Sequence, residues 1–162
     1  MRKRSLSRIT RADLCRLGEL ARIDRTLHFE RSPLTRSLYE RRLFAVALCQ
    51  GAALHYLDKK NGVKDFDVWS FYTESSVRPF PARRVGSMDF GPSKFGKISG
   101  SRFTGRGVDC IGRSIPNAKR NDPIGTLRAY LRDGRTASAR HLANKAVVLI
   151  EPRHLLGTVV WP

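Results

Sequence analysis

The stretch VKDFDVWSFY, residues 63–72, decides how the chain is interpreted. It is rich in aromatic and β-branched residues and is bounded by Asn-Gly before it, which predicts a strand. Alternation along that strand places Asp65 and Asp67 on one face, together with Trp69 and Phe71. Neighbouring carboxylates on one face repel each other, so we expect a cation to compensate this pair.

A second strand is predicted for residues 107–112, with the sequence GVDCIG. Asp109 lies between apolar residues there, where a carboxylate is costly unless it is paired or bound to a metal. If the two strands are adjacent, Asp65, Asp67 and Asp109 form one cluster of hard oxygen ligands suited to one or two Mg²⁺ ions. Such ions stabilise the in-line displacement at a phosphoryl group.

Other interpretations of these acids remain open from the sequence. Asp65 and Asp67 could line a solvent-facing edge and pair with nearby arginines, because an isolated D-x-D pattern is common. Asp89, in Met-Asp-Phe, and Glu74, just after the first strand, are alternative third carboxylates.

The residues before the D-x-D strand carry a resemblance to a known family. Residues 46–57, VALCQGAALHYL, read as an apolar run, a break at Gly51 and a short helix. This arrangement resembles the nucleotidyltransferase superfamily of the DNA polymerase beta type. It is nearest to the abortive-infection toxin group, in which a Gly-Gly-Thr/Ser-Ala-Leu helix start precedes an Asp-x-Asp strand. The resemblance covers residues 43–113, and the chain departs from the pattern at Gln50, where a small residue is usual.

The resemblance implies a magnesium-dependent enzyme that uses a nucleoside triphosphate as substrate. Asp65 and Asp67 would hold the metal ions, and Asp109 would be the third carboxylate and the base for an incoming hydroxyl. Gly51 would be the phosphate-loop glycine, since a helix start without bulky side chains is a natural anion site. The remaining expected nucleotide-binding residues are Ala52, Arg83, Arg84 and Arg106. The resemblance also implies a toxin-like role with an antitoxin-type protein partner.

The charge of the chain points to anionic partners. The 162 residues carry 31 Lys and Arg against 14 Asp and Glu, a formal net charge of +17. Residues 75–121 hold ten basic and two acidic residues, so a phosphate-binding surface is expected there. RNA is therefore a candidate partner, and a non-catalytic basic nucleic-acid-binding protein on a similar scaffold is the alternative function.

The rest of the chain predicts an α+β domain, with a small mixed sheet and N-terminal helices packed on it. We expect a basic, mobile tail over residues 1–10 and a single domain over 11–162, helical over 11–42 and with C-terminal helices and a strand over 114–162. The apolar run 43–49 fits either helix or buried strand. It is far shorter than a membrane span, and no signal peptide is evident, so a cytoplasmic location is expected.

Overall fold

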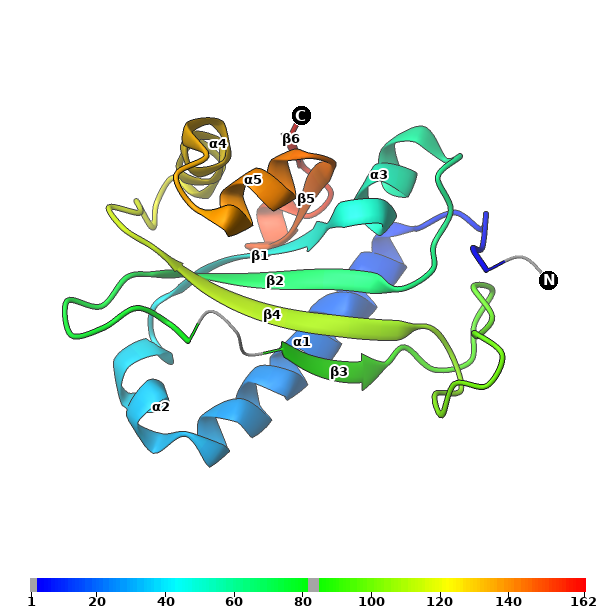
Figure 1. Cartoon of the computed structure of the whole chain (residues 1–162), viewed down its shortest axis with the longest axis horizontal. Coiled ribbons are helices and arrows are strands. Elements are labelled where there is room, and N and C mark those ends of the chain that lie inside the picture. The colour runs from blue at the N-terminus through cyan, green and yellow to red at the C-terminus, as the bar shows by residue number, and fades with distance from the viewer. Residues whose placement is uncertain (1–2, 82–84) are drawn as a thin grey trace.

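The computed structural model of the chain describes residues 3–81 and 85–162. Together they form a mixed sheet with helices on both faces (Figure 1). This confirms the α+β class. In chain order the elements are α1 (Arg11–Arg31), α2 (Pro33–Tyr39), β1 (Leu43–Cys49), α3 (Gln50–Asp58), β2 (Phe66–Thr73), β3 (Val85–Asp89), β4 (Gly107–Ile115), α4 (Pro123–Asp133), α5 (Ala137–Ala143), β5 (Ala146–Glu151), a 3₁₀ turn (Arg153–Leu155) and β6 (Val159–Trp161).

The order and direction of the strands determine which strand ends lie side by side. Across the sheet they are arranged β3-β4-β2-β1-β5-β6. β2 and β4 are parallel, so both begin at the same edge of the sheet. β1 is antiparallel to β2, so β1 ends at that edge, and α3 starts there. The beginnings of β2 and β4 therefore lie beside the turn from β1 into α3.

The apolar run at residues 43–49 is a strand, which settles the alternative left open by its sequence. β1 pairs with β2 on one side and with β5 on the other, and six of its seven residues are buried. Because both faces of this central strand are covered, its sequence shows no alternation.

Two apolar layers cover the sheet. α1 packs on one face, where its Leu14 and Leu17 are fully buried with Phe66 and Val68 of β2. α4 and α5 cover the other face, over Trp69 and Phe71 (Figure 1). The predicted alternation of β2 is thus confirmed. Trp69 and Phe71 stack on each other with ring centroids 6.1 Å apart, inside this second layer.

The helix starts follow the signals in the sequence. Thr10 and Asp13 form a reciprocal capping box at α1, and Asp122 caps α4 through the backbone N–H of Gly125. Thr136 caps α5 by accepting from the N–H of Ala139. Each cap satisfies backbone donors that have no partner within the helix. The second helix ends at Tyr39 instead of continuing to residue 42, since the chain turns there into β1.

The expected free tail over residues 1–10 is wrong for residues 3–10. Ser5 exchanges two backbone hydrogen bonds with Val63, at 2.8 and 2.7 Å. Ile9 is buried against the core below α1. Backbone pairing and apolar burial hold this segment against the domain, although its sequence is basic.

No local sequence pattern predicted β6, which is a short edge strand paired with β5.

Candidate functional site

Asp67 and Asp109 are direct neighbours across the β2–β4 pair. The register of these parallel strands matches Asp67 with Asp109, and parallel strands lie about 4.8 Å apart. Asp65 lies two residues earlier, just before β2 begins. The three predicted acids therefore gather at one edge of the sheet. We call Asp65, Asp67 and Asp109 the acid row.

The neighbouring strands continue this row. Cys49, the last residue of β1, is matched with Asp67, and Ser87 of β3 is matched with Asp109. The Ser87 hydroxyl donates to Oδ1 of Asp109 at 3.0 Å. Register partners present their side chains on the same face, so Asp67 lies between a buried thiol and a second carboxylate.

Burial and like charge perturb this row. The pKa of Asp67 is raised to about 7, first by burial and then by the nearby carboxylates of Asp65 and Asp109, with Lys145 opposing the shift. The pKa of the Cys49 thiol is raised well above its usual value, again mainly by burial and then by Asp67. A raised carboxyl pKa of this kind is typical of functional sites, where like charges are held together.

Arginine pairing does not explain the acid row within the described part of the chain. The ion pairs found within the described residues, 3–81 and 85–162, involve other carboxylates. One example is the pair of Asp13 with Lys94, at 2.9 Å. A salt-bridged D-x-D edge is therefore not found among these residues, and the arginine charge that acts on Asp65 from a distance is that of Arg106.

Hydrogen bonds already occupy both alternative third acids, Asp89 at the same edge of the sheet and Glu74 at the opposite one. Asp89 accepts hydrogen bonds from the backbone N–H groups of Gly91, Thr104 and Gly105 and from the Thr104 hydroxyl. The Thr104 N–H is the main cause that lowers the pKa of Asp89 to about 2. Glu74 follows β2 at its opposite end and accepts from the Ser114 hydroxyl at 3.0 Å. Of the three candidates, Asp109 is thus the one matched in register with Asp67, whereas Asp89 shares that edge but is occupied by four hydrogen bonds.

The turn from β1 into α3 has unusual backbone geometry. Gln50 has a positive φ of 63°, which lies in the left-handed region. This conformation is energetically unfavourable for any residue other than glycine. Its side-chain amide donates to the carbonyl of His141 at 3.3 Å, which helps to hold this conformation. Gln50 therefore keeps a glycine-like backbone at the position where the sequence resemblance leads one to expect a small residue.

Gly51 lies in a tight cationic setting. A Cβ at this position would lie 3.2 Å from Nδ2 of Asn61, 3.4 Å from a guanidinium nitrogen of Arg4 and 3.9 Å from Nζ of Lys145. Among the described residues, no side chain caps the start of α3. Ala52 is buried in the core, so only its backbone is near this turn. Two cations and the first turn of α3 thus face the same small space beside the acid row.

Arg106 corrects one of the predicted nucleotide contacts. Its guanidinium is buried and donates to the carbonyls of Phe95 at 2.8 Å, Lys3 at 2.8 Å and Lys64 at 3.3 Å. These bonds join three chain segments and give Arg106 a structural role in place of the predicted contact with a nucleotide. Arg83 and Arg84 lie outside the described residues.

Sequence analysis missed Arg4 and Lys145 as neighbours of the site. Arg4 lay in the presumed tail, and Lys145 lies between α5 and β5, far along the chain. Only the antiparallel β1–β5 pairing brings Lys145 beside Gly51, so no local pattern signalled it.

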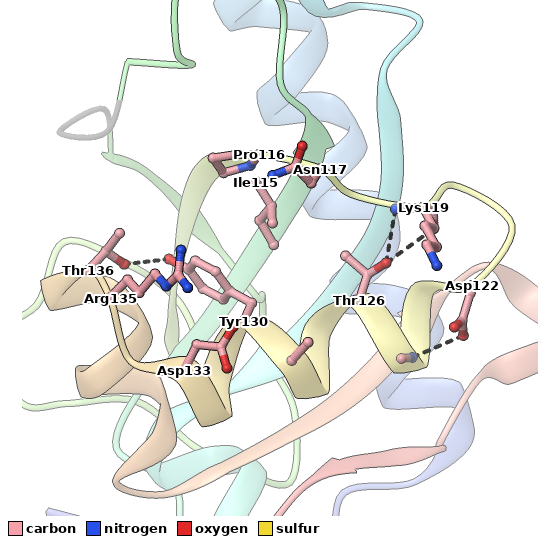
Figure 2. A pocket seen from close by; sticks show the side chains of 12 residues that line it. Ile115, Pro116, Asn117, Lys119, Asp122, Thr126, Tyr130, Asp133, Arg135 and Thr136 are labelled. Carbon is pink, nitrogen blue, oxygen red and sulfur yellow. Dashed lines mark hydrogen bonds between the residues drawn. The ribbon is translucent and has the colours of Figure 1, made fainter.

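A cavity of about 500 Å³ lies at the other end of β4 (Figure 2). It runs along α4 from Lys119 to Arg135, with Ile115 and Tyr130 among its walls. Ile115 is six residues beyond Asp109 on one strand, or roughly 20 Å at 3.3 Å per residue. This cavity is therefore separate from the acid row.

The donor chemistry of the acid row fits a hard divalent cation, because all three side chains offer carboxylate oxygens. Within the described ranges, however, no three or more His, Cys, Asp or Glu side chains form a closed metal-ligand group. The acid row is thus a set of neighbouring carboxylates whose side chains have not closed around one point, as expected where like charges repel.

Comparisons with protein-family models, curated proteins and solved structures found no match to this chain. Among the described residues, no helix has the length and apolar character needed to span a membrane.

Proposed function

We propose that this protein is a divalent-metal-dependent nucleotidyltransferase that moves a nucleotidyl group from a nucleoside triphosphate to a hydroxyl acceptor. The observation that carries the proposal is the direct pairing of Asp67 with Asp109, next to Asp65, at the edge where β1 turns into α3. The raised pKa of Asp67 supports it, because it reflects first the burial of this carboxyl and then the nearby carboxylates of Asp65 and Asp109.

Each residue of the site has a defined part in this reaction. Asp65, Asp67 and Asp109 would hold Mg²⁺, which neutralises charge on the reacting phosphates when bound. Arg4 and Lys145, beside Gly51, would attract the triphosphate to the start of α3. The acceptor oxygen forms a bond to the α-phosphorus while the bond from that phosphorus to the bridging oxygen breaks, and pyrophosphate leaves. The hydroxyl proton passes to Oδ2 of Asp109, since Oδ1 already accepts from Ser87.

Thermal denaturation with Mg²⁺ and each of the four nucleoside triphosphates tests the binding part of this proposal. At ten times Kd a ligand adds about 1.4 kcal/mol of stability, or a melting-temperature rise of roughly 3–5 °C for a chain of this size. The rise should require metal and nucleotide together and should disappear in Asp67→Asn. Glu74→Gln, at the far end of the same strand, is the matched control and should keep the rise.

Transfer itself is measured with α-³²P-labelled triphosphates and total RNA, casein or a sugar alcohol as acceptor. We expect label to enter one acceptor class in the wild type and in Glu74→Gln, and not in Asp67→Asn. Absence of any metal-dependent nucleotide binding at millimolar concentrations would contradict the proposal.

A further inference from the structure

Lysine is confined almost entirely to one end of this molecule. The chain has 23 arginines and eight lysines, and the arginines are spread over most elements. Seven of the eight lysines, however, belong to segments at the edge that carries the acid row, and all seven are exposed. They are Lys3, Lys59, Lys60, Lys64, Lys94, Lys97 and Lys145. We call this surface the lysine end.

Three segments far apart in sequence carry six of the seven lysines of the lysine end, and Lys145 lies between α5 and β5. The three segments are the N-terminal residues 3–8, the turn 59–64 between α3 and β2, and the loop 91–106 between β3 and β4, which lie together at one end of the sheet (Figure 1). The Ser7 hydroxyl donates to the carbonyl of Lys94 at 3.1 Å, which joins the first segment to the third. The Ser5–Val63 backbone pair joins the first to the second.

Two buried side chains fasten these segments. Arg106 donates to the carbonyls of Lys3, Lys64 and Phe95, one in each segment. His55 accepts from the N–H of Gly62 at Nδ1 and contacts the carbonyl of Ser7 through Nε2, both at 2.9 Å. Since Nδ1 is the acceptor, Nε2 carries the proton and donates to Ser7. The segments of this surface are therefore held together through their backbone atoms, and these contacts do not use the lysine ammonium groups.

The other acids at this end are already used by the backbone. Asp13 caps α1 and pairs with Lys94, Asp58 accepts from the N–H groups of Lys60 and Asn61, and Asp89 holds the loop. Within the described residues, Lys94 is the one lysine of the surface in an ion pair. The remaining ammonium groups are available to an anionic partner that extends across several segments.

We propose that the lysine end binds the phosphodiester backbone of a nucleic-acid strand. Lysine is a compact charge on a flexible stem and contacts phosphate without fixed geometry, which suits a backbone recognised along its length. Lys64 directly precedes Asp65, and Lys145 is close enough to Asp67 to influence its pKa. A nucleic-acid strand bound to this surface would therefore bring its end to the acid row. That the end of this strand accepts the nucleotidyl group rests on the proposed function, whereas the binding of the strand does not.

Fluorescence anisotropy with a labelled 12-nucleotide single-stranded RNA, and with DNA of the same sequence, tests the surface over a salt series. The variant K59Q/K60Q/K64Q removes three charges from the central turn. The matched control R41Q/R132Q/R153Q removes three exposed arginine charges outside the lysine end, whose side chains make no hydrogen bond among the described residues. K59R/K60R/K64R restores the charge at the turn.

We expect the lysine variant to raise Kd at least about tenfold near 100 mM NaCl and to reduce the slope of log Kd against log salt by about 2. The arginine control should change Kd by less than about threefold, and K59R/K60R/K64R should bind as the wild type does. Binding of RNA and DNA alike assigns the affinity to phosphates, and preference for RNA adds contacts to the 2′-hydroxyl; both support the surface.

Equal losses in the lysine and arginine variants, no loss in either, or equal competition by a polyglutamate peptide would overturn the proposal, because binding would then follow net charge alone. The failure of the surface is separable from that of the enzyme. Asp67→Asn should retain RNA binding, and a protein that binds RNA at the lysine end without metal-dependent nucleotide binding would overturn the proposed function only.

Discussion

Two sets of polar side chains share one end of the sheet. One set is hydrogen-bonded to the backbone, and the other consists of neighbouring carboxylates. Arg106, His55 and Asp89 are hydrogen-bonded to backbone atoms, and Asp89 accepts from three backbone N–H groups and from the Thr104 hydroxyl. Asp67 and Asp109 instead lie against each other, and the pKa of Asp67 rises to about 7 where that of Asp89 falls to about 2.

The contrast teaches which polar residues build the end and which remain for chemistry. A fold that can place four hydrogen bonds on one aspartate has the means to satisfy another, yet the acid row keeps its like charges together. Strain of this kind persists where function requires it. The following predictions test that division, beginning with the largest expected effect.

Asp67→Asn should separate activity from stability. Transfer should fall by roughly a thousandfold or more, because the change removes a central metal ligand. Stability at pH 8 should rise, since a buried like charge is removed. Labelled-nucleotide transfer and urea unfolding measure the two effects. A variant that loses stability at pH 8 as well as activity would place Asp67 with the structural set.

The pH dependence of stability should carry the signature of Asp67. An aspartate has a pKa of about 3.9 when unfolded, so a folded value of about 7 means that the native state holds an extra proton between these values. The contribution of this group to stability is therefore present at acid pH and is lost as the pH rises from about 4 to 7. The loss is about 4 kcal/mol at most.

Urea unfolding at pH 5 and pH 8 measures this contribution as the difference between wild type and Asp67→Asn. Asp89 has the opposite sign, because its lowered pKa gives a contribution that is lost only as the pH falls from about 4 toward 2. Asp65→Asn should reduce the Asp67 effect without abolishing it. Identical pH profiles of stability for wild type and Asp67→Asn would contradict the raised pKa of Asp67.

Arg106→Met should destabilise the protein by about 3 kcal/mol, because one buried and two partly buried carbonyls lose their donor. Hydrogen exchange should become faster in residues 3–8 and 91–106 together, since both segments depend on this side chain. Arg102→Met, in the same loop but exposed, should cost less than about 1 kcal/mol. Equal effects of the two variants would remove Arg106 from the structural set.

Glu74→Gln should have the smallest effect. It replaces the acceptor of the Ser114 hydroxyl bond at the far end of β2, which costs about 1 kcal/mol or less. Nucleotide binding and transfer should stay at the wild-type level. Loss of transfer in this variant would show that the acid row is not the separate site that the geometry indicates.

Much of this site could be predicted because its signals are local. The alternation around Asp65 and Asp67 and the lone Asp109 in a second strand are visible in short windows of sequence. Their pairing required only that β2 and β4 be adjacent, which the structure shows. Helix caps at Thr10, Asp122 and Thr136 were equally local.

The parts that sequence missed depend on long-range contacts. Arg106 has the appearance of an exposed base between two glycines, and only the folded chain brings Lys3 and Lys64 to its guanidinium. Lys145 reaches Gly51 through the pairing of β5 with β1. The basic N-terminal residues seemed a free tail because Val63, their backbone partner, is distant in sequence.

The most direct test of the central claim is a carboxyl ¹³C NMR titration of Asp67, with and without Mg²⁺. We expect a midpoint near 7 without metal, and saturating Mg²⁺ should lower it by at least about 2 pH units, because bound cations favour the ionised carboxylate. A midpoint near 4 that Mg²⁺ does not move would contradict it.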